Sequence, residues 1–314
     1  MSKWTIADIP SLSGKRALIT GANSGIGFQA ARHLAIAGCT IVLACRDAAK
    51  GESARRRIRQ EVPNADIEVA GLDLASLAST RAAGEAYLKS GQPLDLLINN
   101  AGVMAIPTRQ TTVDGFEKQF GTNHLGHFAL TGLLLPAILA APAARVVTVA
   151  SIAHKGAKMR FEDLQYTRGY SPWPPYGQSK LANLLFAFEL NRRLASAGSA
   201  AISVAVHPGL SKTSIFSSTQ GKGRGLKSRI APTFMALLAQ SDEQGAYPTL
   251  YGATSPHALG GHYYGPDGVL EWRGAPQEVK AKPQALDEAA AARLWEISEG
   301  LTGVRYSALE PART

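Results

Sequence analysis

Short apolar runs alternate with longer stretches of helix-forming composition over most of the chain. The apolar runs predict strands over residues 17–20, 40–44, 67–72, 94–98, 146–150 and 202–206. The stretches between them predict helices over residues 26–37, 48–61, 77–90, 115–140 and 176–197. Strands that are apolar on both faces and alternate with helices are typical of a parallel sheet covered by helices on both sides. We therefore expect an α/β fold, a doubly wound parallel sheet in a Rossmann-like three-layer α/β/α arrangement.

The pattern changes toward the C-terminus. Residues 210–240 show no strand pattern and predict a loop with a short helix, whereas residues 260–268 are rich in turn-forming residues. Residues 288–301 predict an amphipathic helix with Trp295 on its apolar side. We interpret this part as a C-terminal cap segment. The chain is then a single domain over residues 1–314, with a nucleotide half at about 15–150, a catalytic and substrate half at about 151–314 and a substrate lid at about 210–240.

The chain is basic, with a net charge of +9. One basic cluster, residues 55–59, lies in a helix-forming run and is expected to be a solvated helix face. A second cluster, made of Lys222, Arg224, Lys227 and Arg229, lies in a Gly- and Ser-rich stretch and predicts a loop. A polyanionic cofactor accounts for part of this charge, and the sequence contains no motif of a nucleic-acid reader, so we expect no nucleic-acid partner.

Cysteine content and hydropathy indicate a cytoplasmic protein. Cys39 and Cys45 flank one apolar run, and two cysteines imply no disulfide framework. Residues 1–10 contain no apolar stretch of the kind that a secretory signal carries. The uncharged run over residues 121–144 is long enough to span a membrane. Because it lies between two other motifs, we expect instead a helix buried against the sheet or a partner subunit, and no membrane span.

A glycine-rich turn marks the expected nucleotide end. Gly21, Gly25 and Gly27 follow the first predicted strand and open the first predicted helix. Small residues there let the backbone approach a pyrophosphate, and the start of the helix supplies unpaired N–H donors. The spacing is G-x-x-x-G-x-G, which differs from the G-x-G-x-x-G dinucleotide fingerprint.

Arg46 ends the second predicted strand, where a nucleotide-binding fold contacts the adenosine ribose. A guanidinium suits a 2′-phosphate, so Arg46 favours NADP, whereas the adjacent Asp47 would hold a free 2′-hydroxyl and leaves NAD open as the less favoured cofactor. Asp73 and Leu74 follow the third strand, and residues 99–102 follow the fourth, at the strand ends where ligands bind in such sheets. A helix N-cap at Asp73 and a turn at residues 99–102 are the structural alternatives.

Tyr176 and Lys180 are four residues apart, which places them on one face of a helix. A nearby ammonium favours the phenolate, so the phenol becomes a usable acid or base near neutral pH. The proline-rich residues 172–175 are not expected to be helical until just before the tyrosine, which would put Tyr176 near a helix start. Ser151 follows an apolar strand and is therefore expected at the same edge of the sheet.

Taken together, these motifs resemble the short-chain dehydrogenase/reductase (SDR) family. The matching segments occur in the family's order at residues 20–27, 99–102, 123, 151, 176–180 and 208–209. Residues 43–47, 122–128, 176–183 and 293–295 resemble the retinol dehydrogenase and protochlorophyllide-reductase-like branch. The N-terminal membrane anchor that many retinol dehydrogenases carry has no counterpart in residues 1–10, so retinol itself is not the substrate we expect.

The resemblance implies four catalytic roles. Tyr176 exchanges a proton with the substrate oxygen, Lys180 lowers the pKa of Tyr176 and binds the nicotinamide ribose, Ser151 polarises the substrate oxygen, and Asn123 supports a chain of waters. Each residue taken alone could be an ordinary cap, packing or surface residue. The implied cofactor-binding residues are Gly21, Asn23, Ser24, Gly25, Ile26, Gly27, Arg46, Asp73, Leu74, Asn100, Ala101, Gly102, Tyr176, Lys180, Pro208 and Gly209.

The predicted function is an NADP(H)-dependent interconversion of an alcohol and a ketone or aldehyde. A non-catalytic NADP sensor or scaffold and a C=C reductase are the alternatives. Apolar residues in the lid favour a lipophilic small-molecule substrate, namely Ile215, Phe216, Phe234, Met235, Leu237 and Leu238. We expect no metal, because no His, Cys or carboxylate cluster has ligand spacing. His154 and His207 are expected to be structural, and helices 115–140 and 176–197 to form a homodimer or homotetramer interface, as in the family.

Overall fold

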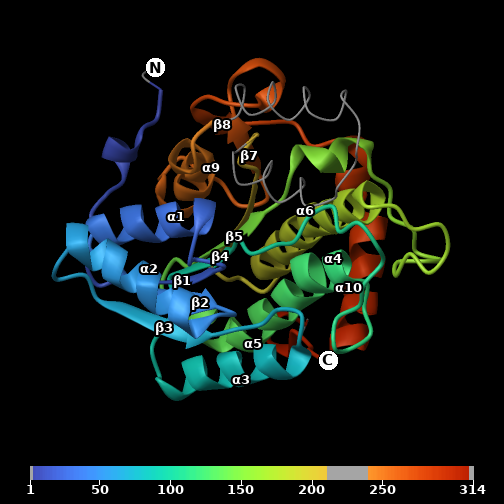
Figure 1. Cartoon of the computed structure of the whole chain (residues 1–314), viewed down its shortest axis with the longest axis horizontal. Helices are drawn as coiled ribbons and strands as arrows, with labels where there is room; N and C mark the ends of the chain where they lie inside the picture. Colours follow the sequence, from blue (N-terminus) through green and yellow to red (C-terminus); the bar gives the residue numbers. More distant parts are fainter. Residues whose placement is uncertain (1–2, 211–239, 311–314) are drawn as a thin grey trace.

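An eight-stranded sheet lies at the centre of the computed structural model, which describes residues 3–210 and 240–310 (Figure 1). The strand order is β3-β2-β1-β4-β5-β6-β7-β8. Strands β1 to β7 pair in parallel, and β8 is antiparallel to β7. The strands are β1 Arg16–Thr20, β2 Thr40–Cys45, β3 Ile67–Gly71, β4 Leu96–Asn99, β5 Arg145–Val149, β6 Ile202–Val206, β7 Tyr263–Pro266 and β8 Pro276–Glu278. The order 3-2-1-4-5-6 is that of a dinucleotide-binding sheet, which confirms the predicted fold.

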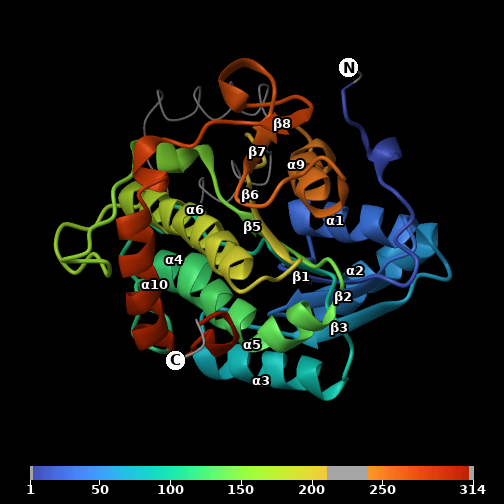
Figure 2. The same cartoon turned by 180° about the vertical axis from the view of Figure 1, so that it is seen from behind.

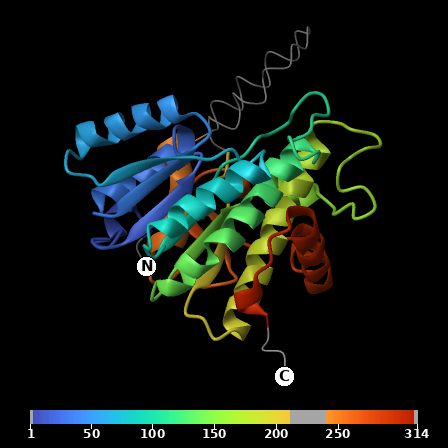
Figure 3. The same cartoon turned by 90° about the horizontal axis from the view of Figure 1, so that it is seen from below.

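Helices cover both faces of this sheet (Figures 1 and 2). One face carries α1 (Gly25–Ile36), α2 (Ala48–Glu61) and α9 (Asp242–Thr254). The other carries α3 (Leu77–Lys89), α5 (Gly126–Ala140), α6 (Trp173–Ser196) and α10 (Glu288–Thr302), which lie side by side in Figure 3. A short α4 (Lys118–Phe120) and a π-helical turn, η2 (Gly121–Leu125), lead directly into α5. The buried strands explain the continuous apolar runs in the sequence, because both of their faces pack against helices.

The six strands expected from the apolar runs are all present, but the C-terminal part of the sheet was not predicted. Residues 260–268 were expected to be turns, yet they contain β7, which pairs with β6 at Tyr263 and Tyr264. Its sequence Tyr-Tyr-Gly-Pro has neither an apolar run nor an alternation, so its pairing with β6 and β8 makes it a strand. Helix α9 also lacked a signal, because Gly245, Pro248 and Gly252 lower its helix propensity.

The proline-rich stretch before Tyr176 is helical, contrary to the prediction. Helix α6 begins at Trp173, so Pro174 and Pro175 lie in its first turn. Proline is tolerated there because the first N–H groups of a helix have no partner within the helix. Tyr176 nevertheless lies near the helix start, as expected.

The long apolar helix over Lys118–Ala140 is mostly buried inside the protein. It is the one helix among the described residues that is long and apolar enough to cross a membrane, and 72% of its apolar window is buried. Trp295 of α10 packs against Phe128 of α5 and Phe186 of α6, with ring centroids 5.2 and 5.8 Å apart. Helix α10 therefore covers part of the surface through which the family resemblance implies that subunits pair.

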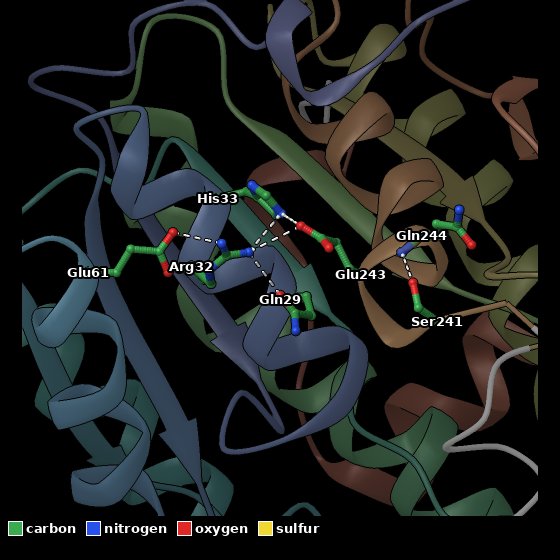
Figure 4. Close-up of polar contacts among 7 residues, drawn as sticks. All are labelled: Gln29, Arg32, His33, Glu61, Ser241, Glu243 and Gln244. Atoms are coloured by element: carbon green, nitrogen blue, oxygen red, sulfur yellow. Dashed lines mark hydrogen bonds and ion pairs between the residues drawn. The ribbon is translucent and has the colours of Figure 1, made fainter.

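A network of charged side chains joins α1, α2 and α9 on the opposite face of the sheet (Figure 4). Arg32 of α1 donates two bonds to Glu61 of α2, at 2.5 and 2.6 Å, and a third to Glu243 of α9, at 3.2 Å. Glu243 also lies 3.0 Å from the buried His33, whose pKa is lowered mainly by burial. The guanidinium of Arg32 thus connects α1 and α2, in the nucleotide half, to α9 in the C-terminal half of the chain.

We expect the Arg32→Ala substitution to lower the free energy of unfolding by about 1–2 kcal/mol, because it removes a bidentate pair and its link to Glu243. Urea denaturation at neutral pH measures the change. Arg55→Ala is the matched control, since Arg55 makes a single exposed pair with Glu52 within α2, and it should cost less than about 0.5 kcal/mol. Equal losses in the two variants would contradict a linking role for Arg32.

Candidate active site

The carboxyl ends of the parallel strands bring the predicted site residues to one edge of the sheet. Thr20 ends β1, Ser151 follows β5 by two residues, and Pro208 follows β6 by two residues. Open α/β sheets bind ligands at this edge, outside the carboxyl ends of the strands. The site therefore depends on the connections that leave these strands.

The glycine turn after β1 requires glycine at particular positions. Gly21 and Gly25 have positive φ angles of 66° and 59°. A Cβ at Gly27 would lie 2.5 Å from Asn100 Nδ2 and 2.7 Å from the Gly21 carbonyl oxygen. Ser24 is the N-cap of α1, and its side chain makes no capping bond. The first N–H groups of α1 therefore stay open to an anion, and the turn fits the pyrophosphate of a dinucleotide.

Arg46 and Asp47 follow β2 and are both exposed. The Asp47 carboxylate caps α2 by accepting a bond from the Lys50 N–H at 3.1 Å, and the Lys50 ammonium lies 3.6 Å away. These contacts hold the pKa of Asp47 below its usual value. Asp47 is therefore engaged by its own helix.

Asp73 forms a turn rather than a helix cap. Its carboxylate accepts a bond from the Ala75 N–H at 3.0 Å, and the N-cap of α3 is Ser76. Leu74 is buried, and its carbonyl oxygen lies against Gly126, where a Cβ would approach it to 2.5 Å. The turn after β3 is thus packed on the start of α5.

The segment after β4 is tied to the end of β1. The Asn100 and Ala101 N–H groups both donate to Thr20 Oγ1 at 2.9 Å, and Asn100 Nδ2 donates to the Thr20 carbonyl at 2.9 Å. A Cβ at Gly102 would lie 3.2 Å from Asn123 Oδ1 and 3.6 Å from Lys180 Nζ. This segment therefore passes from the glycine turn directly to Asn123 and Lys180, two of the predicted catalytic residues.

Ser151 and Tyr176 meet at the centre of the edge. Ser151 caps the short helix η3 (Ile152–Gly156), and its hydroxyl accepts a bond from the Ala153 N–H at 3.2 Å. The Tyr176 side chain is half-buried, and burial raises the pKa of its phenol, while a bond with the Ser151 side chain partly offsets that rise. The pair can present two hydroxyl groups to one substrate oxygen.

Lys180 is buried beneath the tyrosine, with only 4% of its surface exposed. Its ammonium donates to the Val149 carbonyl at 2.9 Å and lies 5.9 Å from the centroid of the Tyr176 ring. Burial lowers the pKa of Lys180 to about 8. The group is therefore still mostly charged at neutral pH, where a nearby positive charge favours the phenolate of Tyr176.

Asn123 lies in the π-helical turn η2 and is fully buried. Its side chain accepts a bond from the Val103 N–H at 2.8 Å and donates to the Val103 carbonyl and to Ser179 Oγ, both at 2.9 Å. The Asn123 side chain therefore bonds two distant segments of the chain rather than the backbone of its own helix. π-Helical turns are frequent at functional sites.

A second group of contacts holds Pro208 and Gly209. Gly209 has a φ of 68°, and a Cβ there would lie 2.3 Å from the Trp272 carbonyl oxygen. The Leu210 N–H donates to the same oxygen at 2.9 Å, and Gln240 Nε2 donates to the Pro208 carbonyl. Both ends of the segment 211–239 are thus fixed. That segment, with the predicted lid residues and the second basic cluster, lies outside the described residues.

Nothing in the sequence indicated Glu271, whose carboxylate connects the loop of Ser151 to the segment of Pro208 and Gly209. Glu271 Oε1 lies 2.7 Å from Lys155 Nζ in η3, and Oε2 lies 3.1 Å from His207 Nε2 at the end of β6. These partners lower the pKa of Glu271 to about 2 against the effect of burial. Leu270 and Glu271 both have positive φ angles, 56° and 59°. No sequence signal marked this residue, because its neighbours come from distant parts of the chain.

The two histidines near the site are both buried and contact other groups of the protein. His154 is fully buried, with Nδ1 2.7 Å from the Ser151 carbonyl oxygen and its ring edge-on to Tyr263. His207 is also fully buried, and its Nδ1 accepts a bond from the Gly209 N–H at 3.2 Å. Within residues 3–210 and 240–310, no three His, Cys, Asp or Glu side chains gather as a metal site requires.

The sequence matches the short chain dehydrogenase family over residues 15–222. Retinol dehydrogenase 13 of Homo sapiens is 41% identical over 298 residues, which cover 94% of this chain and 86% of that protein. Polyprenol dehydrogenase of Homo sapiens is 36% identical over 302 residues, which cover 94% of this chain and 87% of that protein. The similarity therefore extends well beyond the region matched by the family.

Solved structures agree with this relationship. A crystal structure of an uncharacterized protein from Mycobacterium paratuberculosis superposes with a TM-score of 0.78 and 42% identity, covering 97% of this chain and 99% of that chain. The NADP active-site complex of Pseudomonas aeruginosa RhlG superposes with a TM-score of 0.60 and 25% identity, covering 81% of this chain and 94% of that chain.

The buried ammonium of Lys180 has a measurable consequence for stability. Its pKa falls from 10.5 to about 8 on folding, so between these two pH values the unfolded chain binds more protons than the folded one. Stability therefore rises with pH across this window, and the cost of burying the charge is complete below about pH 8. By linkage, the full difference corresponds to about 3 kcal/mol.

Urea unfolding of the wild type and of Lys180→Met from pH 7.5 to 10 tests this prediction. We expect the stability of the wild type to rise relative to the variant over the upper part of that range. Buried cysteines and tyrosines, such as Cys39 and Tyr87, titrate in both proteins, so the difference isolates the lysine. A difference that stays constant with pH would show that the ammonium is not perturbed by burial.

Proposed function

The chain belongs to the short chain dehydrogenase family, and from that membership we propose that it is an NADP(H)-dependent oxidoreductase that interconverts an alcohol and a ketone or aldehyde. The family and the retinol dehydrogenase relatives support oxidoreduction between alcohol and carbonyl groups. The single observation that carries the proposal is the placement of Ser151 and Tyr176 over the buried ammonium of Lys180 at the ligand edge of the sheet.

The protein's own residues would supply proton transfer and orientation. Tyr176 donates its phenolic proton to the carbonyl oxygen during reduction and takes it back during oxidation. Lys180 stabilises the phenolate formed when the proton leaves, and Ser151 donates a hydrogen bond to the same substrate oxygen. Asn123, which is held by Val103, fixes the segment beside Lys180. The bound nicotinamide supplies or accepts the hydride.

The residues at the nucleotide end fit NADP better than NAD. Gly21, Gly25 and Gly27 would take the pyrophosphate at the start of α1. Arg46 is exposed at the end of β2 and is free to meet a 2′-phosphate, whereas Asp47 is engaged as the cap of α2. The RhlG complex with NADP is a further argument for the same cofactor.

A lipophilic alcohol or carbonyl compound is the substrate class that we propose. Two relatives are named for retinol and for polyprenol, which are alcohols with long apolar chains. The apolar residues of the segment 210–240 favour the same class. We further propose that the protein is cytoplasmic and acts on a small-molecule substrate. We also propose a homodimer or homotetramer whose contacts involve the surface of α5 and α6 that α10 leaves uncovered.

Replacing Tyr176 by Phe should reduce turnover by about 100-fold or more, because general acid–base catalysis is worth 10²–10⁴-fold. NADPH binding should change little, since the ring is retained. The measurement is NADPH oxidation with all-trans-retinal and with a panel of lipophilic ketones, with products identified by mass spectrometry. Saturation of a C=C bond would favour the C=C reductase alternative, and full activity of the variant would exclude Tyr176 as the acid. A wild type that binds NADPH and turns over none of the panel would favour the sensor or scaffold.

The Arg46→Ala substitution should weaken NADPH binding by about 10-fold or more, because a charge-assisted pair with the 2′-phosphate is lost. NADH binding should stay nearly unchanged, since NADH has no 2′-phosphate. Titration with each nucleotide, followed by tryptophan fluorescence and calorimetry, measures the two dissociation constants. Arg56→Ala is the control for net charge, since Arg56 is exposed on α2. A preference of the wild type for NADH would overturn the choice of NADP.

A further inference from the structure

His127 is a buried histidine for which the proposed chemistry has no role. It lies in the first turn of α5, and only 1% of its surface is exposed. Its Nε2 atom is 2.8 Å from Thr20 Oγ1, at the start of the glycine turn, and its Nδ1 atom is 2.9 Å from the carbonyl oxygen of Asn123. One ring thus connects the nucleotide end of the edge with the catalytic asparagine.

The partners of His127 determine where its proton lies. Burial lowers the pKa of His127 to about 4, so the ring is neutral at neutral pH. A carbonyl oxygen can only accept, and therefore Nδ1 carries the hydrogen and donates to Asn123. Nε2 must then accept a bond from the hydroxyl of Thr20.

The hydroxyl of Thr20 is left with no other close acceptor. It already accepts bonds from the N–H groups of Asn100 and Ala101, each at 2.9 Å. The carbonyl oxygen of Ile98 is 3.4 Å away, which is longer than the 2.8 Å to His127 Nε2. The donors and acceptors therefore form one directed chain from the β4 segment through Thr20 and His127 to Asn123.

This series of hydrogen bonds leads back to the segment after β4 through the side chain of Asn123. That side chain holds both backbone groups of Val103, which lies just beyond Ala101 in the β4 segment. The segment from Asn100 to Val103 is therefore held at its start by Thr20 and at its end by Asn123. His127 contacts both of these anchors, Thr20 through Nε2 and Asn123 through Nδ1.

We propose that His127 is a positioning residue that couples the nucleotide-binding turn to the catalytic Asn123, by bridging the Thr20 hydroxyl and the Asn123 carbonyl. The proposal rests on the proposed function for its consequence in cofactor binding. The predicted effect within the protein, the ordering of residues 100–103, does not depend on the proposed function.

His124 provides a matched control one helical turn earlier. It is also 1% exposed, and burial lowers its pKa to about 3. Its Nε2 atom contacts Ser298 Oγ of α10 at 2.9 Å, whereas that of His127 contacts Thr20. A Phe substitution at either position removes a buried polar ring while keeping its volume approximately.

The experiment compares His127→Phe with His124→Phe in two measurements. The first is the dissociation constant for NADPH, at a temperature where urea unfolding shows both variants to be folded. We expect about 10-fold weaker binding in His127→Phe, from the loss of two hydrogen bonds, and a change within about 2-fold in His124→Phe. The second is hydrogen exchange of the free protein, in which the amides of residues 100–103 should exchange faster only in His127→Phe.

A double-variant comparison tests the route through Thr20. If His127 acts through that hydroxyl, Thr20→Val together with His127→Phe should bind NADPH within about 2-fold of Thr20→Val alone. Independent, multiplicative losses would overturn the proposal, as would equal effects of the two histidine variants on both measurements. A wild type that binds no nicotinamide nucleotide would refute the proposed function, while the exchange rates would still decide the role of His127.

Discussion

The burial of the Lys180 ammonium is the constraint on which the rest of the site depends. A charge removed from water is costly unless hydrogen bonds compensate for it. Lys180 finds its acceptor in the carbonyl of Val149, the last residue of β5, and Asn183 Nδ2 donates to the same oxygen at 3.1 Å. Helix α6 is thereby fixed to the end of β5. That attachment places Tyr176, one turn earlier on the same helix, beside Ser151, which follows the same strand.

The loop that carries Ser151 is held by polar contacts in addition to the packing of Ala150 and Ala157. His154 bonds the Ser151 carbonyl, and Lys155 pairs with Glu271. Glu271 in turn meets His207, which holds the backbone at Gly209. The loop of Ser151 and the segment at Gly209 are thus both connected to the carboxylate of Glu271. The left-handed backbone at Leu270 and Glu271 is a cost that these contacts offset.

The sequence predicts those parts of the molecule whose causes are local. Gly21, Gly25 and Gly27 are spaced by the turn that they make, and Tyr176 and Lys180 by the helix that carries them. Predictions were wrong or absent where the cause is distant in the chain. Strand β7 exists because β6 pairs with it, and Glu271 matters because η3 and β6 end beside it.

Misjudged local chemistry accounts for the remaining errors. The prolines before Tyr176 were treated as a barrier to the helix, although the first turn of a helix has no N–H partner to lose. Asp73 was considered as a helix cap, but Ser76 lies at the position that the start of α3 requires. In both cases the residue type suggested several roles, and the exact register of the helix start decided between them.

Contacts at Leu210 and Gln240 connect the borders of the segment 211–239 to the turn that holds Glu271. Its two ends are fixed, at Leu210 by the carbonyl of Trp272 and at Gln240 by the carbonyls of Pro208 and Leu210. The same Trp272 belongs to the turn that presents Glu271 to the loop of Ser151. Leu210 is therefore connected to the loop of Ser151 through Trp272 and the neighbouring Glu271.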